Sequence, residues 1–302
     1  MNISKFENII EHSDQFLKGK KEQVKLVLCN LLSRGHTLIE DAPGVGKTTL
    51  VKYIGKSIGL EVSRIQFTND LLPADILGTS IFHKETSNFE LHKGPLFGEL
   101  ILADELNRAP PKTQSALLQA MEERQITIDG TTYELPKHFT VMATQNPQMQ
   151  VGTFNLPESQ LDRFSMKIKM GHTNEAVTIE LLKASTLQVD LSNIESIISI
   201  DELLKSQKEL DTIHTSDEIY QLIYKLLEST RTNKDLIALS NRCGIDLVNV
   251  SKAWAYLAGR DYVIPDDVHH IFKYVAGHRL VHPENSDVDF EHKMAAKVLA
   301  NA

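Results

Sequence analysis

The chain has 302 residues, 41% of them hydrophobic and 24% charged, which is typical of a globular protein that buries a sizeable core. Its formal net charge of −8 argues against a surface built mainly to bind the phosphates of nucleic acids. The two cysteines, Cys29 and Cys243, show neither CxxC nor metal-ligand spacing, which favours a reducing compartment over a disulfide framework.

The N-terminal segment, MNISKFENIIEHSDQFLKGKKEQ, lacks the apolar stretch of a secretory signal. In the whole sequence, no apolar run approaches the ~20 residues that a membrane-spanning helix needs. We therefore expect a cytoplasmic protein without a membrane span.

Short apolar segments bounded by turn-forming residues recur through the first half of the chain and predict buried strands of a parallel sheet. In chain order they cover residues 36–40, 61–67, 99–105, 138–144 and 166–170. Helical patterns lie between them, at 48–59 and 112–124. This alternation predicts an α/β fold in which helices flank a parallel sheet.

A different pattern occurs at 126–136, where apolar and polar residues alternate around Asp129-Gly130, the signal of a β-hairpin. Beyond about residue 172 strand signals largely stop, and amphipathic helical patterns take over. These helices are expected at 175–187, 216–231, 244–258 and 265–280. The sequence therefore predicts an α/β domain over 1–172 and a small all-α domain over 173–302.

Residues 44–48, GVGKT, follow a predicted strand and open a predicted helix, which is the context of a phosphate-binding loop. Gly44 and Gly46 let the backbone turn sharply, so that N–H groups face phosphates at the positive end of the helix. Lys47 reaches the β- and γ-phosphates, and the hydroxyl of Thr48 is a ligand for Mg²⁺. The alternative is a glycine-rich turn with an incidental lysine.

The usual pattern of such a loop, G-x-x-x-x-G-K-[ST], begins with a glycine, but this chain has Asp41 at that position. An aspartate can begin a turn through its own side chain, because its carboxylate substitutes for a backbone hydrogen bond. Pro43 further restricts the loop. We therefore expect the loop to bind a nucleotide despite the missing glycine.

Polar residues end two further predicted strands. Asp104 and Glu105 close the strand in ELILADE, where the first acid can hold Mg²⁺ and the second can deprotonate the attacking water. Asn146 follows the strand in VMATQNP and can bind the γ-phosphate or the water. The alternatives are a solvated pair of carboxylates and a simple Asn-Pro turn. Parallel strands would bring these residues to the ligand-binding edge of the sheet.

Together these residues resemble the AAA+ ATPases, and specifically the MoxR family. The resemblance covers nearly the whole chain and follows a series of motifs in order: GHTLIEDAPGVGKTTL (35–50), LLPADILG (71–78), GPLFGELILADELNRAPPKTQSALLQAMEERQITIDG (94–130), ATQNP (143–147), LPESQLDRF (156–164) and VAGHRL (275–280). In that family too, an acidic or other residue replaces the first glycine, so Asp41 looks like a family variant.

The resemblance implies roles for individual residues. Glu105 and Asn146 match the catalytic acid and the sensor 1 residue, while Arg163 in LDRF matches the arginine finger that enters a neighbour's site. Arg242 matches sensor 2, although this chain has SNR where the family usually has SPR. Both arginines have the alternative of a surface ion pair.

The implied nucleotide site also includes an N-terminal turn near the adenine. Gly19 lies in this turn. The whole implied nucleotide site consists of Gly19, Pro43, Gly44, Val45, Gly46, Lys47, Thr48, Thr49 and Asp104, of which Thr48 and Asp104 are the metal ligands.

The family resemblance implies an Mg²⁺-dependent ATPase, with ATP/ADP and Mg²⁺ as cofactors, that forms a homo-oligomeric ring, expected to be a hexamer. It implies remodelling or maturation of client proteins, with a partner that carries a von Willebrand factor A domain. The insert at 71–78 and the hairpin at 126–136 would then face the pore or the client, or else be simple surface loops.

Three alternative functions remain open from the sequence. The chain could be a nucleic-acid motor, although its acidic balance favours no nucleic-acid partner. It could be a regulatory module without hydrolysis, which the presence of Glu105 disfavours, or a motor subunit of a metal chelatase.

Overall fold

The computed structural model describes residues 2–85, 87–146, 153–183, 190–191, 194–233, 236–281 and 287–301. Its centre is a five-stranded parallel sheet. The strands, in their order across the sheet, are β2 (Val62–Gln66), β5 (Leu100–Asp104), β8 (Thr140–Gln145), β1 (Thr37–Glu40) and β9 (Met166–Ile168). Each coincides with a segment predicted from the sequence, and the α/β fold is confirmed.

Helices surround this sheet in the first half of the chain. Their bounds are α1 (Ile3–His12), α2 (Lys21–Leu32), α3 (Lys47–Ile58), α4 (Pro73–Leu77), α5 (Pro111–Glu123) and α6 (Glu158–Leu161). Short 3₁₀ turns are η1 (Ser13–Gln15), η2 (Pro95–Phe97) and η3 (Leu106–Arg108). The predicted helices at 48–59 and 112–124 correspond to α3 and α5.

The sheet separates two apolar cores because successive residues of a strand point to opposite faces. On β1, Ile39 packs with α1, α2, α3 and the C-terminal helices, whereas Leu38 packs with α5 on the other side. Burial on both faces explains the nearly continuous apolar sequence of β5, and β8 is buried along its whole length as well. The first core extends without a break into the C-terminal helices, and the domain boundary near residue 172 stays a prediction.

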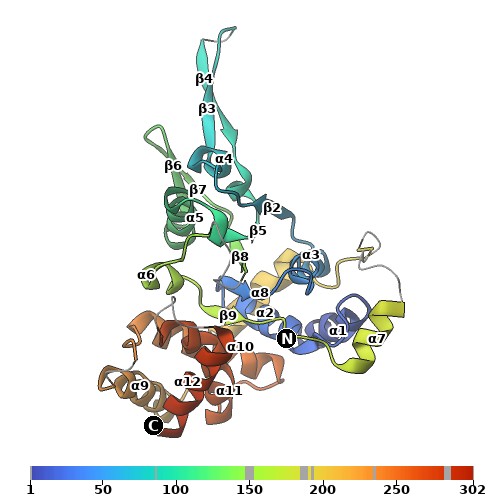
Figure 1. Ribbon diagram of the computed structural model, residues 1–302, viewed down its shortest axis with the longest axis vertical. Helices are drawn as coiled ribbons and strands as arrows, with labels where there is room; N and C mark the ends of the chain where they lie inside the picture. The colour runs from blue at the N-terminus through green and yellow to red at the C-terminus, as the bar shows by residue number, and fades with distance from the viewer. Residues whose placement is uncertain are drawn as a thin grey trace.

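Within the described residues, two β-hairpins project from the α/β part, whereas the sequence predicts one of them. The expected hairpin forms from β6 (Gln125–Ile128) and β7 (Thr131–Glu134). A second, longer one forms from β3 (Gly78–His83) and β4 (Asn88–Lys93), directly after α4, and extends furthest from the rest of the molecule (Figure 1). The sequence does not predict this hairpin, because its strands are exposed on both faces and no apolar alternation marks them.

The C-terminal part consists of helices in the described residues. They are α7 (Glu175–Lys183), α8 (Ile200–Leu210), α9 (Asp217–Arg231), α10 (Asn241–Leu257), α11 (Pro265–Ala276), the turn η4 (Gly277–Arg279) and α12 (Val288–Asn301). Helices α9 to α12 gather at the end of the molecule opposite the long hairpin (Figure 1).

Two of these helices were missing from the sequence-based prediction. Helix α8 begins with a capping box, in which Ser199 and Glu202 bind each other's backbone N–H groups, a signal readable in the sequence. Helix α12 also was not predicted. The predicted helix at 175–187 is observed as far as Lys183, and residues 184–187 lie outside the described part.

None of the helices in the described ranges combines the length and apolar character that crossing a bilayer demands.

Candidate functional site

The loop between β1 and α3 has the backbone that phosphate binding needs. Gly44 and Gly46 have φ angles of 84° and 94°, in the left-handed region that strains other residues. A Cβ atom at Gly44 would meet nothing within 4 Å, so the surface of the loop is open there. Helix α3 has no side-chain cap at its N-terminus and no acidic residue in its first turn. Its free N–H groups and positive dipole end are therefore available to an anion.

Lys47 lies at the first position of α3, with its side chain folded back over the strand ends. Its Nζ donates to the carbonyl oxygen of Asp41 (2.5 Å), that of Gln145 (3.3 Å) and Oδ1 of Asn146 (2.9 Å). Burial lowers the pKa of Lys47, and the nearby carboxylates of Asp41, Asp104 and the neighbouring acids oppose that shift. The structure thus brings Lys47 and Asn146, predicted independently, into direct contact.

Asp41, which replaces the usual glycine, connects the loop to the segment after β9. Its Oδ1 accepts from the N–H of Ala42 (2.7 Å) and its Oδ2 from the N–H of Gly171 (2.7 Å). The side chain is buried, and Lys20 lies close enough for its charge to interact with this carboxylate. The Asp41 side chain thus accepts from the next residue and not from the residue two further on, because Pro43 has no N–H, and it also fixes the loop to a distant backbone.

Replacing Asp41 by alanine should lower the free energy of unfolding by about 1–3 kcal/mol, because two N–H donors lose their acceptor. Urea denaturation followed by circular dichroism measures this. The control is Asp70→Ala, since Asp70 is exposed and accepts from the neighbouring Thr68, and its effect should stay within about 0.5 kcal/mol. Equal stability of the two variants would mean that Asp41 does not fix the loop.

Asp104, the last residue of β5, has each carboxylate oxygen engaged. Thr144 Oγ1 donates to Oδ1 (2.6 Å), and the guanidinium of Arg64 donates to Oδ2 from Nη2 (2.7 Å) and Nε (3.2 Å). Arg64 lies on β2, which pairs with β5. The carboxylate therefore already holds a cation at the position where a metal ligand was predicted.

Glu105 follows Asp104 in a left-handed backbone conformation, with φ of 57°. Its N–H donates to Thr144 Oγ1 (2.9 Å). Its Oε2 accepts from Gln66 (3.2 Å) and from Arg108 (2.8 Å), while its Oε1 accepts from Nδ2 of Asn146 (3.3 Å). Residues of β2, η3 and the end of β8 thus hold the Glu105 carboxylate in one position. Such restraint is what a catalytic group needs.

Asn146 directly follows β8 and links the other predicted residues. It accepts from Lys47, donates to Glu105, and its carbonyl oxygen accepts from Nδ2 of Asn107 (3.1 Å). The alternative for Asn146 was a simple Asn-Pro turn. Pro147 lies outside the described residues.

The remaining predicted nucleotide-binding residues surround the loop. Gly19 has a φ angle of 70°, in the left-handed region. Its N–H donates to Oδ1 of Asp14 (2.9 Å), which stabilises the turn. A Cβ at Gly19 would lie 3.9 Å from Val177 on α7, so the N-terminal turn and α7 are neighbours. Pro43 is exposed, Val45 packs partly against the core, and Thr48 and Thr49 are half-buried in the first turn of α3.

The two predicted arginines both contact helix α5, at the same residue, Glu122. Arg163 donates to the carbonyl of Leu118 (2.5 Å) and pairs with Oε2 of Glu122 (2.7 Å). Arg242, in the first turn of α10, pairs with Oε1 of the same Glu122 (2.6 Å). The hydrogen bond from Arg242 lowers the pKa of Glu122, and the charges of both arginines add to that effect. Arg163 and Arg242 thus lie together, with their partners on α5, whereas Lys47 has its partners at the ends of β1 and β8.

Sequence reasoning missed Arg64, Gln66 and Thr144, which contact the two acids. All three lie near the C-terminal ends of β2 and β8, the strands on either side of β5. Thr144 is buried, so its need for a partner is a signal that could have found it. Arg64 and Gln66 are exposed on β2 and carry no such signal.

These residues fit a nucleotide with Mg²⁺. The open loop with free N–H groups suits phosphates. The hydroxyl of Thr48 and the carboxylate of Asp104, which pairs with Arg64 in this structure, are oxygen ligands of the kind that Mg²⁺ prefers. The fold and this site define a nucleotide-binding α/β domain with a helical lid.

Comparisons with known proteins agree. Residues 36–166 match the ATPase family associated with various cellular activities (AAA), and residues 235–298 match the AAA lid domain. The chain is 42% identical to the uncharacterized protein YeaC of Bacillus subtilis, over 91% of this chain and 87% of that protein. It is 36% identical to Chaperone MoxR1 of Mycobacterium tuberculosis, over 92% and 76% of the two chains.

The fold has also been observed by crystallography. The structure of an inferred ATPase from Cytophaga hutchinsonii superposes with a TM-score of 0.87 and 34% identity, and the match covers 99% of this chain and 94% of the other. The chain belongs to the MoxR family of AAA+ ATPases and is an ATPase.

Proposed function

We propose that this ATPase requires Mg²⁺, assembles into a hexameric ring in the cytoplasm, and uses hydrolysis to remodel or mature client proteins. In each active site, the phosphate loop of one subunit would meet Arg163 and Arg242 of the next.

The observation that carries this proposal is the meeting of Arg163 and Arg242 at Glu122. Their side chains are 27% and 42% exposed, so two cations from different elements are presented at one surface. Two adjacent guanidinium groups suit a ligand with several negative charges, and a γ-phosphate is such a ligand. Because their partners lie on α5, away from those of Lys47, a neighbouring subunit is the natural source of that phosphate.

Each residue of the loop and strand ends then has a role in hydrolysis. Lys47 binds the β- and γ-phosphates, Asn146 orients the attacking water, and Glu105 takes its proton. Arg163 of the neighbouring subunit stabilises the charge of the transition state. Thr48 and Asp104 would hold Mg²⁺, which when bound neutralises charge on the phosphate oxygens.

Two observations support a role in remodelling other proteins: the name of a relative, and an exposed aromatic pair on the long hairpin. The relative from Mycobacterium tuberculosis is named Chaperone MoxR1. On the long hairpin, Phe82 and Phe89 are 48% and 73% exposed and pack against each other, with ring centroids 5.2 Å apart. Exposed aromatic pairs of this kind are suited to contact with other proteins. We extend the proposal to a partner with a von Willebrand factor A domain and to a role without nucleic acid.

Mixing two inactive variants tests the shared site. An Arg163→Ala subunit keeps its phosphate loop and loses its finger, whereas a Lys47→Ala subunit keeps its finger and loses its loop. Each pure variant should be nearly inactive, but mixed rings should contain some complete sites. Because an arginine finger contributes ~10³-fold or more to the rate, even a minority of restored sites should exceed the background.

The measurement is the ATPase rate as a function of the mixing ratio, under conditions where subunits are shown to exchange by fluorescence energy transfer. A maximum at intermediate ratios is the expected result. A straight line between the two pure variants would mean that Arg163 acts within its own chain or has only a structural role.

A further inference from the structure

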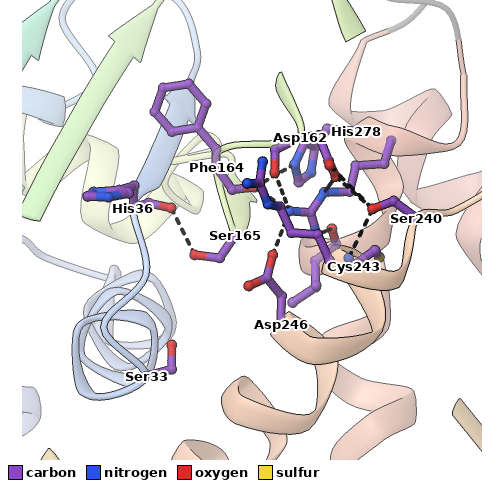
Figure 2. Close-up of polar contacts among 12 residues, drawn as sticks. Ser33, His36, Asp162, Phe164, Ser165, Ser240, Cys243, Asp246 and His278 are labelled. Atoms are coloured by element: carbon purple, nitrogen blue, oxygen red, sulfur yellow. Dashed lines mark hydrogen bonds and ion pairs between the residues drawn. The ribbon is translucent and has the colours of Figure 1, made fainter. Parts of the chain in front are cut away.

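Arg279, in the turn η4, binds the backbone on both sides of Arg163. Its Nη2 donates to the carbonyl oxygen of Asp162 (2.8 Å) and to that of Phe164 (3.1 Å). Figure 2 shows Asp162 and Phe164 near Asp246, Cys243 and Ser240 of the lid. One side chain of the helical lid therefore holds a carbonyl group before the proposed finger and another one after it.

The guanidinium of Arg279 is itself fixed by two carboxylates. Its Nη2 donates to Oδ2 of Asp246 on α10 (2.6 Å), and its Nε forms an ion pair with Oδ1 of Asp162 (2.9 Å). The Arg279 side chain is only 4% exposed. A buried charge is stable only where it is paired and hydrogen-bonded, so the guanidinium has essentially one place to lie.

Asp162 extends these contacts to the start of α10. Ser240 Oγ donates to its carboxylate (3.2 Å to Oδ1) and accepts from the N–H of Cys243, which caps the helix (Figure 2). Arg242 lies in the first turn that this cap defines. The loop of Arg163 and the helix of Arg242 are thus joined through Asp162.

His278 adds a second bond from η4 to the loop. Its Nε2 lies 2.9 Å from the carbonyl oxygen of Phe164. Burial lowers the pKa of His278 well below its ordinary value, with the charges of Arg279 and Lys167 acting in the same direction. The neutral imidazole therefore donates from Nε2, and the Phe164 carbonyl accepts two bonds from adjacent residues.

We propose that Arg279 is a positioning residue for hydrolysis: it holds the loop of Arg163 and the start of α10 as one unit, so that both arginines reach the neighbouring subunit's phosphates together. The inference rests on the proposed function, because it assumes that these arginines act there. A movement of the lid would then displace both arginines at once, which couples the lid's position to the activity of the next site.

Arg279→Lys tests this role while keeping the positive charge. A lysine ammonium cannot reproduce the planar fork that serves two carbonyls and two carboxylates. Since misplacement of a catalytic group by ~1 Å can cost about a hundredfold, we expect kcat to fall by roughly 10- to 100-fold. The affinity for ATP should stay within about twofold, because the subunit's own phosphate loop is intact.

Arg260→Lys is the matched control. Arg260 forms a bidentate pair with buried Asp267 (2.6 and 2.7 Å), also between lid elements, but its contacts lie within the lid. A general loosening of the lid would lower kcat in both variants, whereas positioning of Arg163 predicts loss in Arg279→Lys alone. If Arg279→Lys fails to fold by circular dichroism, Asp162→Asn removes the ion pair and keeps the shape, and should show the same loss of kcat.

Mixed rings separate this inference from the proposed function. Arg279→Lys subunits should regain activity with Lys47→Ala subunits, which supply a correctly placed finger, and not with Arg163→Ala subunits. If Arg163→Ala is rescued by Lys47→Ala but Arg279→Lys is not, the positioning role is wrong and the shared site stands. If neither is rescued, the shared site is wrong and the inference falls with it.

Discussion

A Lys47→Ala variant should lose ATP hydrolysis by about a hundredfold or more, since Lys47 is the cation that the structure places beside the open phosphate loop. Its Nζ already bonds to Asn146 and to carbonyls at the ends of β1 and β8. The ammonium therefore lies where phosphate oxygens would replace these acceptors. The measurements are the steady-state rate of phosphate release and the affinity for a fluorescent ATP analogue.

Lys52→Ala is the control for this experiment. Lys52 lies on the same helix, α3, but is exposed, so its removal changes the net charge equally without touching the loop. Its turnover should match the unmodified protein within about twofold. Normal turnover in Lys47→Ala would show that the loop between β1 and α3 does not bind the phosphates that are hydrolysed.

Glu105→Gln should bind ATP but hydrolyse it ~10²- to 10⁴-fold more slowly. Glutamine has nearly the same shape, and its single amide oxygen can accept either from Asn146 or from Gln66 and Arg108. What it lacks is the basicity that removes the proton from water. A ring trapped with ATP should then be stable enough to detect by size-exclusion chromatography with light scattering.

Glu123→Gln serves as the comparison, because Glu123 is an exposed residue of α5 that accepts from Gln119 (3.0 Å). It should hydrolyse ATP at the normal rate. Unchanged turnover in Glu105→Gln would mean that another group is the base, whereas slow turnover without a larger assembly would count against the ring alone.

The trapped form is also a reagent for capturing clients, and clients held by the long hairpin should be lost when Phe89→Ser is added.

Much of the site could be predicted from local sequence patterns. Gly46, Lys47 and Thr48 lie where a strand gives way to a helix, and Asp104 and Asn146 lie where apolar strands end. These patterns work because a parallel sheet brings its strand ends to one edge, whatever the details of packing. Their proximity, including the bond from Lys47 to Asn146, followed once the strand order was known.

The long hairpin shows where local patterns fail. Burial on one face produces the alternation by which a strand is recognised, and β3 and β4 are exposed on both faces. Helix α8 differs from this hairpin, since its capping box of Ser199 and Glu202 is a local signal in the sequence.

By itself, the sequence determined the α/β order of the elements, the glycine turn between β1 and α3, and the family, because each is read from short motifs whose residues lie close together in the chain. The tertiary structure alone decided that Arg163 and Arg242 share Glu122, and that Arg279 holds the backbone around Arg163. The partners in these contacts are as far as 120 residues apart in the chain. Which of them meet depends on how the lid helices pack against α5 and the sheet, and no period of apolar residues encodes that packing.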